Sequence, residues 1–127
     1  IQPIREGESV PLHATASGKA ILAFLPEEEQ DAVLDGQLEA YTDATRTDLS
    51  AIEKEIEEIR QQRLARDEGE YRADVECVGA PIVDGSGYPR GAVAVSGGSD
   101  ELVGRARDAD ASLIVSASKS IENELTE

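Results

Sequence analysis

The clearest structural signal in this chain is the stretch VECVGAPIVDGSGYPRGAVAVSG, residues 75–97. Its first part, Val75 to Val83, is rich in β-branched residues, which favour strands. The segment 84–87, Asp-Gly-Ser-Gly, has the composition of a tight turn. From Arg90 to Gly97 apolar residues return, with alternating valines. The pattern therefore predicts a β-hairpin with its turn near residues 84–87.

Residues two apart on a strand share a face. One face of this hairpin carries small side chains, Cys77, Gly79 and Pro81 on the first strand and Ala92, Ala94 and Ser96 on the second. The turn position places Cys77 opposite Ala94 or Ser96. Small side chains either leave a pocket above the sheet or let a helix approach closely, and the hairpin alone leaves both interpretations open.

Helical spacing of apolar residues dominates the rest of the chain. It predicts helices over 15–25, over a short segment opened by Pro26, over 48–64 and over 100–125, and residues 1–5 resemble a short strand. In the third helix the expected apolar stripe begins at Leu49, and residues 50–53 fit a capping box. In the last helix Leu102, Ala106, Leu113, Ala117, Ile121 and Leu125 fall along one side. This order of elements indicates an α+β fold with helices packed on an antiparallel sheet.

Charge excludes several functions. The chain has 127 residues, 27 of them acidic and 12 basic, for a net charge of −15. Such a surface repels nucleic-acid phosphates and anionic membranes, so we expect this chain to bind neither. An excess of Asp and Glu with few lysines also suggests a protein that works in concentrated salt. The single cysteine predicts a reducing, cytoplasmic location, and a single histidine disfavours a metal site.

Four positions could carry chemistry. The segment 15–18 combines small residues with a helix start, where free backbone N–H groups attract a carboxylate. Asp67 could add a polar group at a pocket rim. Cys77 could act as a nucleophile and His13 as a base, although the acidic neighbour Glu76 does not lower a thiol pKa, and a lone histidine is more often structural.

Four stretches together resemble the C-terminal effector-binding domain of the IclR-type transcriptional regulators. They are VPLHATASGKA at 10–20, LEAYT at 38–42, ECVGAPI at 76–82 and AVAVSG at 92–97. Their order and spacing agree with that family over nearly the whole chain.

The resemblance implies a GAF-like domain over residues 1–127 that lacks its first sheet elements and binds no cofactor or metal. It implies a winged helix-turn-helix domain, absent from this chain, through which alone the protein contacts DNA. It also implies a small organic or aromatic acid as effector, assembly into homodimers or homotetramers, and no catalysis. The family's pocket positions correspond to Ala16, Ser17, Asp67, Cys77, Ala94 and Ser96.

Two pocket positions depart from the family pattern. Position 16, often Gly or Leu, is Ala, and position 94, often Ser, is Ala. The second change removes a hydroxyl, so we expect the pocket either to hold a small carboxylate less well or to prefer a more apolar acid. An enzyme using Cys77 or His13 and a pure oligomerisation module stay as alternatives.

Overall fold

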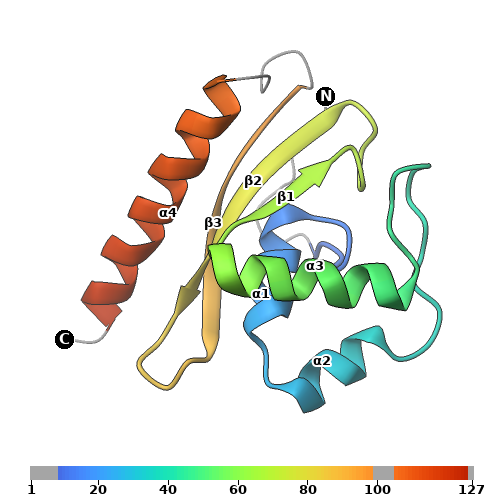
Figure 1. The fold of residues 1–127 in the computed structure, drawn as a ribbon, viewed down its shortest axis with the longest axis horizontal. Helices are drawn as coiled ribbons and strands as arrows, with labels where there is room; N and C mark the ends of the chain where they lie inside the picture. Colours follow the sequence, from blue (N-terminus) through green and yellow to red (C-terminus); the bar gives the residue numbers. More distant parts are fainter. Residues whose placement is uncertain (1–8, 99–104, 126–127) are drawn as a thin grey trace.

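A computed structural model of the protein describes residues 9–98 and 105–125. Its elements, in chain order, are α1 (Ala16–Phe24), α2 (Glu27–Leu34), α3 (Leu49–Gln62), β1 (Ala65–Glu68), β2 (Val75–Val83), β3 (Pro89–Gly98) and α4 (Arg105–Leu125). The described part is thus an α+β fold with four helices and one three-stranded sheet, as the sequence predicts (Figure 1). The expected strand at 1–5 lies outside the described residues.

The sheet is antiparallel throughout, in the order β1-β2-β3. The predicted hairpin is confirmed, and its register pairs Cys77 with Ser96 and Gly79 with Ala94. The sequence did not predict β1, a four-residue strand that pairs Asp67 with Cys77. Three of its four side chains are charged, so it lacks the β-branched and aromatic residues typical of strands.

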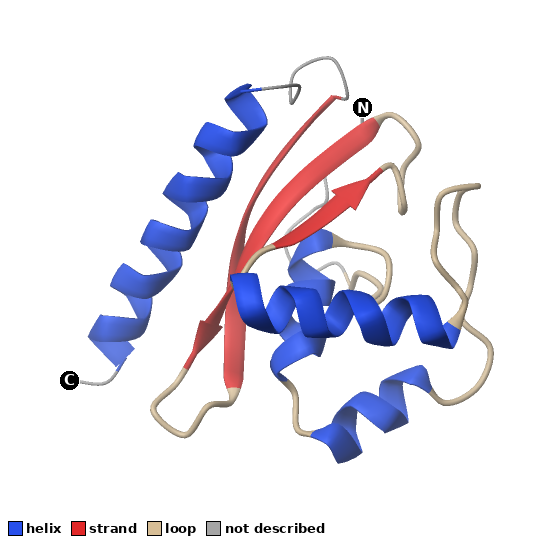
Figure 2. Cartoon of the chain, in the orientation of Figure 1, coloured by secondary structure: helices blue, strands red, loops and turns tan. Residues whose placement is uncertain are grey.

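Helices cover both faces of this sheet (Figures 1 and 2). α1 and α3 lie on one side, where a core joins Ala20, Leu22 and Ala23 of α1 to Ile52, Ile56 and Ile59 of α3. α4 lies on the opposite side and packs more on β2 than on β3. The face of the hairpin with small side chains therefore looks toward α1.

Two details of α3 differ from the sequence predictions. The helix is capped by Asp48, whose side chain accepts a hydrogen bond from the Ala51 N–H, so the predicted capping box at 50–53 is wrong. Leu49 is 49% exposed and does not belong to the buried stripe. Its position in the first turn places it beyond the edge of the core that Ile52, Ile56 and Ile59 fill.

The apolar side of α4 identified in the sequence is not the side that packs on the sheet. From position 111 onward, where burial is described, Ala111, Ile114 and Ser118 are the buried residues of this helix. The apolar side is exposed at Leu113, Ala117, Ile121 and Leu125, while Leu102 and the side chain of Ala106 lie outside the described residues. Ala111 and Ser118, on either side of Ile114, are small and let the helix lie close to the sheet.

Candidate functional site

Three of the predicted site residues form a row across the sheet. Asp67 on β1 pairs with Cys77 on β2, and Cys77 pairs with Ser96 on β3. Because directly paired residues point to the same face, the three side chains lie side by side. The Cys77 Sγ and Ser96 Oγ atoms are 3.0 Å apart and share a hydrogen bond. The row offers a carboxyl group, a thiol and a hydroxyl on the face toward α1.

The first turn of α1 supplies backbone donors near this row. Thr15 is the N-cap, and its Oγ1 accepts from the Gly18 N–H at 3.0 Å while its carbonyl accepts from the Lys19 N–H at 2.8 Å. The N–H groups of Ala16 and Ser17 have no hydrogen-bond partner among the described residues. Two free N–H groups at a helix start are a favourable site for a carboxylate.

Gly79 brings α1 and the sheet into contact. A Cβ atom at this position would lie 3.2 Å from the Ala16 carbonyl carbon, closer than ordinary van der Waals contact. Beyond this contact the face is open, because Ala94 and Ser96 are exposed and Cys77 is half-buried. The close-approach interpretation is thus confirmed at Gly79, and the pocket beside it stays a prediction.

Asp67 is the buried acid of the row, with 3% of its surface exposed. Burial raises the pKa of its carboxyl to about 6, against the opposing effect of the hydrogen bond that its Oδ1 accepts from the Glu70 N–H at 2.7 Å. Near pH 6 the side chain is a mixture of carboxylic acid and carboxylate. The acid form can donate a hydrogen bond to a ligand carboxylate, which the ionised form would repel.

Cys77 and His13, the two residues considered for catalysis, lie in surroundings that fit a structural role. Burial raises the pKa of the Cys77 thiol above its usual value, although the Ser96 hydroxyl opposes this, so the sulfur is a poor nucleophile at neutral pH. His13 is 8% exposed, and its Nε2 donates to the Glu39 carbonyl at 2.8 Å. Its ring packs on Tyr41, with centroids 5.9 Å apart. This histidine anchors the loop that follows α2.

A buried charge cluster beside the site was missed by the sequence reasoning. The Lys19 Nζ lies 2.8 Å from Glu55 Oε2 and 2.9 Å from Glu70 Oε1. Arg46 completes the cluster with contacts of 3.2 Å to Glu55 and 3.3 Å to Glu70. One signal was available, because Lys19 sits within the otherwise apolar predicted helix 15–25. The cluster ties α1 to the residues directly after Asp67.

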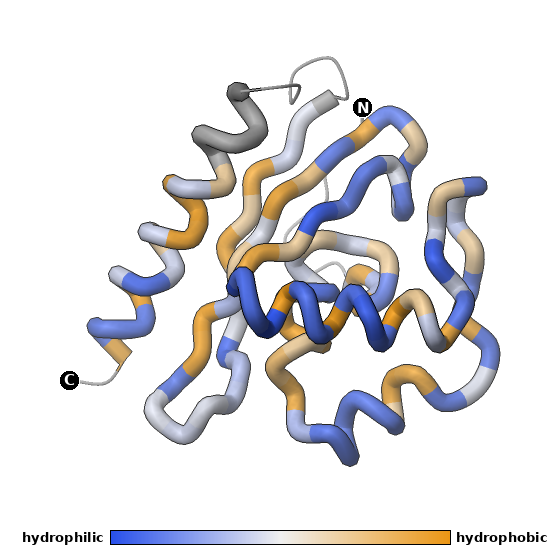
Figure 3. Tube along the Cα trace, viewed as in Figure 1, coloured by the Kyte–Doolittle hydropathy of each residue, from blue (hydrophilic) through white to orange (hydrophobic). Residues whose placement is uncertain are grey.

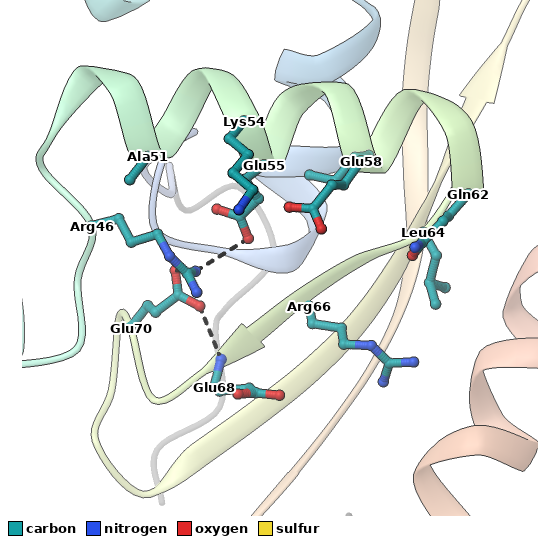
Figure 4. A pocket seen from close by; sticks show the side chains of 11 residues that line it. Arg46, Ala51, Lys54, Glu55, Glu58, Gln62, Leu64, Arg66, Glu68 and Glu70 are labelled. Carbon is teal, nitrogen blue, oxygen red and sulfur yellow. Dashed lines mark hydrogen bonds and ion pairs between the residues drawn. The ribbon is translucent and has the colours of Figure 1, made fainter.

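A polar groove of about 450 Å³ lies between α3 and β1 (Figure 4). Its charged lining residues are Arg46, Lys54, Glu55, Glu58, Arg66, Glu68 and Glu70. None of the predicted site residues lines it. This groove is therefore distinct from the row on the sheet, and Glu70, whose N–H donates to Asp67 Oδ1, connects the two.

The described residues were compared with the requirements of a metal site and of a membrane-spanning helix. No group of three His, Cys, Asp or Glu side chains there could hold a metal ion. No helix within the same residues is long and apolar enough to cross a membrane.

Comparisons with known proteins agree with the fold described above. Residues 2–123 match the family described as "Bacterial transcriptional regulator IclR C-terminal". The HTH-type transcriptional repressor AllR of Escherichia coli K12 is 33% identical over 97 residues, which cover 76% of this chain and 36% of AllR. The crystal structure of the Thermotoga maritima IclR superposes with a TM-score of 0.91 at 34% identity, over 97% of this chain and 50% of that chain.

A third similar structure is the inducer-binding domain of PobR from Acinetobacter, a double mutant in complex with 3-hydroxybenzoic acid. Its TM-score is 0.84 at 21% identity, over 96% of this chain and 72% of that chain, and it supports the fold alone.

Fold and comparisons define an effector-binding domain of a transcriptional regulator and not an enzyme. The chain belongs to the IclR family and corresponds to its C-terminal, GAF-like part. It spans 36% of the length of AllR and half of the Thermotoga protein.

Proposed function

We propose that this domain senses a small organic or aromatic carboxylate at Ala16, Ser17, Asp67, Cys77, Ala94 and Ser96. The observation that carries the proposal is the row Asp67–Cys77–Ser96 beside the two N–H groups of α1 that have no partner within residues 9–98 and 105–125. The ligand carboxylate accepts from the N–H groups at 16 and 17 and from Ser96, and Asp67 in its acid form donates a further hydrogen bond. The aromatic acid bound by PobR is consistent with this ligand class.

The sensor role extends to the full-length protein. There, a winged helix-turn-helix domain outside this chain contacts DNA, and the present domain mediates homodimer or homotetramer assembly in the cytoplasm. An effector can change DNA affinity only if it binds two arrangements of the assembly with different affinities. A net charge of −15 suits this division of labour, because this domain itself repels DNA.

A thermal-shift screen of aliphatic and aromatic carboxylates tests the proposal. A ligand at a hundredfold excess over its dissociation constant adds about 2.7 kcal/mol of stability. We expect one class of acid to raise the melting temperature of the wild type. Ser96→Ala and Asp67→Asn should weaken this response, whereas Ser116→Ala, at an exposed position of α4, should leave it unchanged. No response to any acid would leave only the oligomerisation module.

A high-salt environment is a separate part of the proposal, supported by 27 acidic residues against 12 basic ones. Mutual repulsion among exposed carboxylates weakens the fold in dilute buffer and is screened by salt. The melting temperature should therefore rise between dilute and molar KCl. An unchanged melting temperature would identify an ordinary acidic protein.

A further inference from the structure

The loop between β1 and β2, residues 69–74, carries an arginine beside the proposed carboxylate site. Figure 3 shows that β1 and this loop are mostly hydrophilic. Two backbone hydrogen bonds close the loop, from the Gly69 N–H to the Val75 carbonyl and from the Val75 N–H to the Arg72 carbonyl, both at 3.1 Å. From a neighbouring loop, the Thr42 hydroxyl donates to the Gly69 carbonyl at 2.6 Å. The backbone of Arg72 therefore has a fixed position next to the strands that carry the row.

Aromatic contacts connect this loop with the start of α1. The Tyr71 ring meets the Tyr41 ring edge-on, with centroids 5.0 Å apart. Tyr41 in turn packs on His13, which lies just before α1, with centroids 5.9 Å apart. The Arg72 guanidinium lies over the Tyr71 ring, 5.7 Å from its centroid. The rings thus hold this cation on the side of the domain where α1 begins and presents its N–H groups.

The positive charge of Arg72 is not neutralised by an acidic side chain. Arg72 has no ion pair within residues 9–98 and 105–125, although the chain has 27 acidic residues against 12 basic ones. Arg60 and Lys119 also lack one there, but both are exposed, whereas Arg72 is half-buried. Burial raises the pKa of the Cys77 thiol, and the charge of Arg72 opposes this rise, so its field reaches the row.

Electrostatics make this arginine informative about the ligand. The net charge of −15 disfavours a second negative group on any acid that binds here. A cation that contacts the second group directly reverses this preference. The planar guanidinium fork suits that contact, because it binds a carboxylate through two parallel N–H···O hydrogen bonds. Contact with the Tyr71 ring occupies a face of the guanidinium and leaves the N–H groups at its edge free.

We propose that Arg72 is a specificity-determining residue and that the effector is a dicarboxylate. One carboxylate accepts from the N–H groups of α1 and from Ser96, and the second binds the Arg72 guanidinium. The Tyr71 ring positions the guanidinium for this contact. This inference rests on the proposed carboxylate site and narrows its ligand class, because a monocarboxylate uses only the first half of the site.

Calorimetric titration of the full-length protein with pairs of acids that differ by one carboxylate tests the inference. The pairs are butyrate with succinate, pentanoate with glutarate, and benzoate with isophthalate. We expect at least one dicarboxylate to bind about tenfold or more tightly than its monocarboxylate partner, as for one hydrogen bond to a charged group. Arg72→Gln should abolish this preference and leave the monocarboxylate affinity unchanged.

Two further variants sharpen the test. Arg90→Gln is the matched control and should keep the preference, because Arg90 is a 62% exposed arginine near the hairpin turn, 3.9 Å from Asp84. Arg72→Lys keeps the charge without the planar fork, so it should keep only part of the preference. A graded loss from Arg72 to Lys to Gln, with Arg90→Gln unchanged, would confirm direct contact with the second carboxylate.

The other outcomes separate this inference from the proposed function. A dicarboxylate preference that survives in Arg72→Gln, or monocarboxylates that bind as tightly as their partners, would overturn the role of Arg72 and leave the carboxylate site in place. An equal loss of both acids in Arg72→Gln would also overturn it, because a damaged site does not discriminate between them. Binding of neither class to the wild type would overturn both proposals.

Discussion

Helices α1 and α4 pack on opposite faces of one sheet and differ in which of their residues are buried. α1 has nine residues, and six of them are buried, including the charged Lys19. α4 has 21 residues, and its large apolar side chains Leu113, Ile121 and Leu125 are exposed. Small residues let α1 approach the sheet at Gly79, whereas α4 contacts the sheet along one narrow face. Helical periodicity therefore identifies an amphipathic helix without showing which of its surfaces the domain covers.

Removing the charge of Lys19 in α1 should lower the free energy of unfolding much more than removing a lysine charge from α4. Lys19→Met leaves the buried carboxylate of Glu70 with the Glu68 N–H at 3.2 Å and with Arg46, whose side chain is 46% exposed. An uncompensated buried charge costs about 3–5 kcal/mol, so the free energy of unfolding at pH 7 should fall by this amount. Lys119→Met on the exposed side of α4 is the control and should change it by less than about 0.5 kcal/mol. Urea denaturation measures both, and similar losses would contradict the role of the cluster.

Neighbouring residues of α4 test the corrected orientation of this helix. Ile114 is 7% exposed and Leu113 is 68% exposed. Ile114→Ala should lower the free energy of unfolding of the 127-residue chain by about 2–4 kcal/mol, because it removes buried apolar volume. Leu113→Ala should lower it by less than about 0.5 kcal/mol in the same chain. A larger loss at Leu113 would mean that the side of α4 that carries Leu113 is the buried one.

The pH dependence of stability should report the burial of Asp67. Its raised pKa, about 6, means that the native state keeps a proton which the unfolded chain releases near pH 4. Stability from this group is therefore complete below pH 4 and is lost as the pH rises through 6, by about 2–3 kcal/mol. Asp67→Asn keeps an oxygen for the Glu70 N–H and abolishes the titration. The stability of the variant relative to wild type should rise from pH 4 to pH 7, and a flat difference would refute the raised pKa.

Adding one methyl group at position 79 tests the contact between α1 and the sheet. Gly79→Ala places a Cβ 3.2 Å from the Ala16 carbonyl carbon, so α1 must shift by a few tenths of an ångström. We expect a loss of about 1–2 kcal/mol and weaker binding of any carboxylate that uses the N–H groups of α1. Gly91→Ala is the matched control on β3, with no atom within 4 Å of its Cβ. Calorimetry of the two variants gives the comparison, and equal stabilities would mean that α1 yields freely.

Local patterns determined much of the fold and part of the site. The hairpin and α1 to α3 follow from β-branched runs, turn residues and helical spacing, which act over a few neighbouring positions. The turn position left the partner of Cys77 open between Ala94 and Ser96, and only the structure decided for Ser96. β1 could not be found in this way, because its residues are mostly charged and pairing with β2 stabilises it.

The chain by itself thus determined its family, its acidic surface and the residue types available to the site. Only the tertiary structure decided that Asp67 lies beside Cys77, that Lys19 is buried between two glutamates and that Leu113 faces outward. These outcomes depend on contacts between separate elements, which the packing of whole elements decides. A sequence pattern records the preferences of each element, whereas burial and pKa depend on the neighbours that the fold brings together.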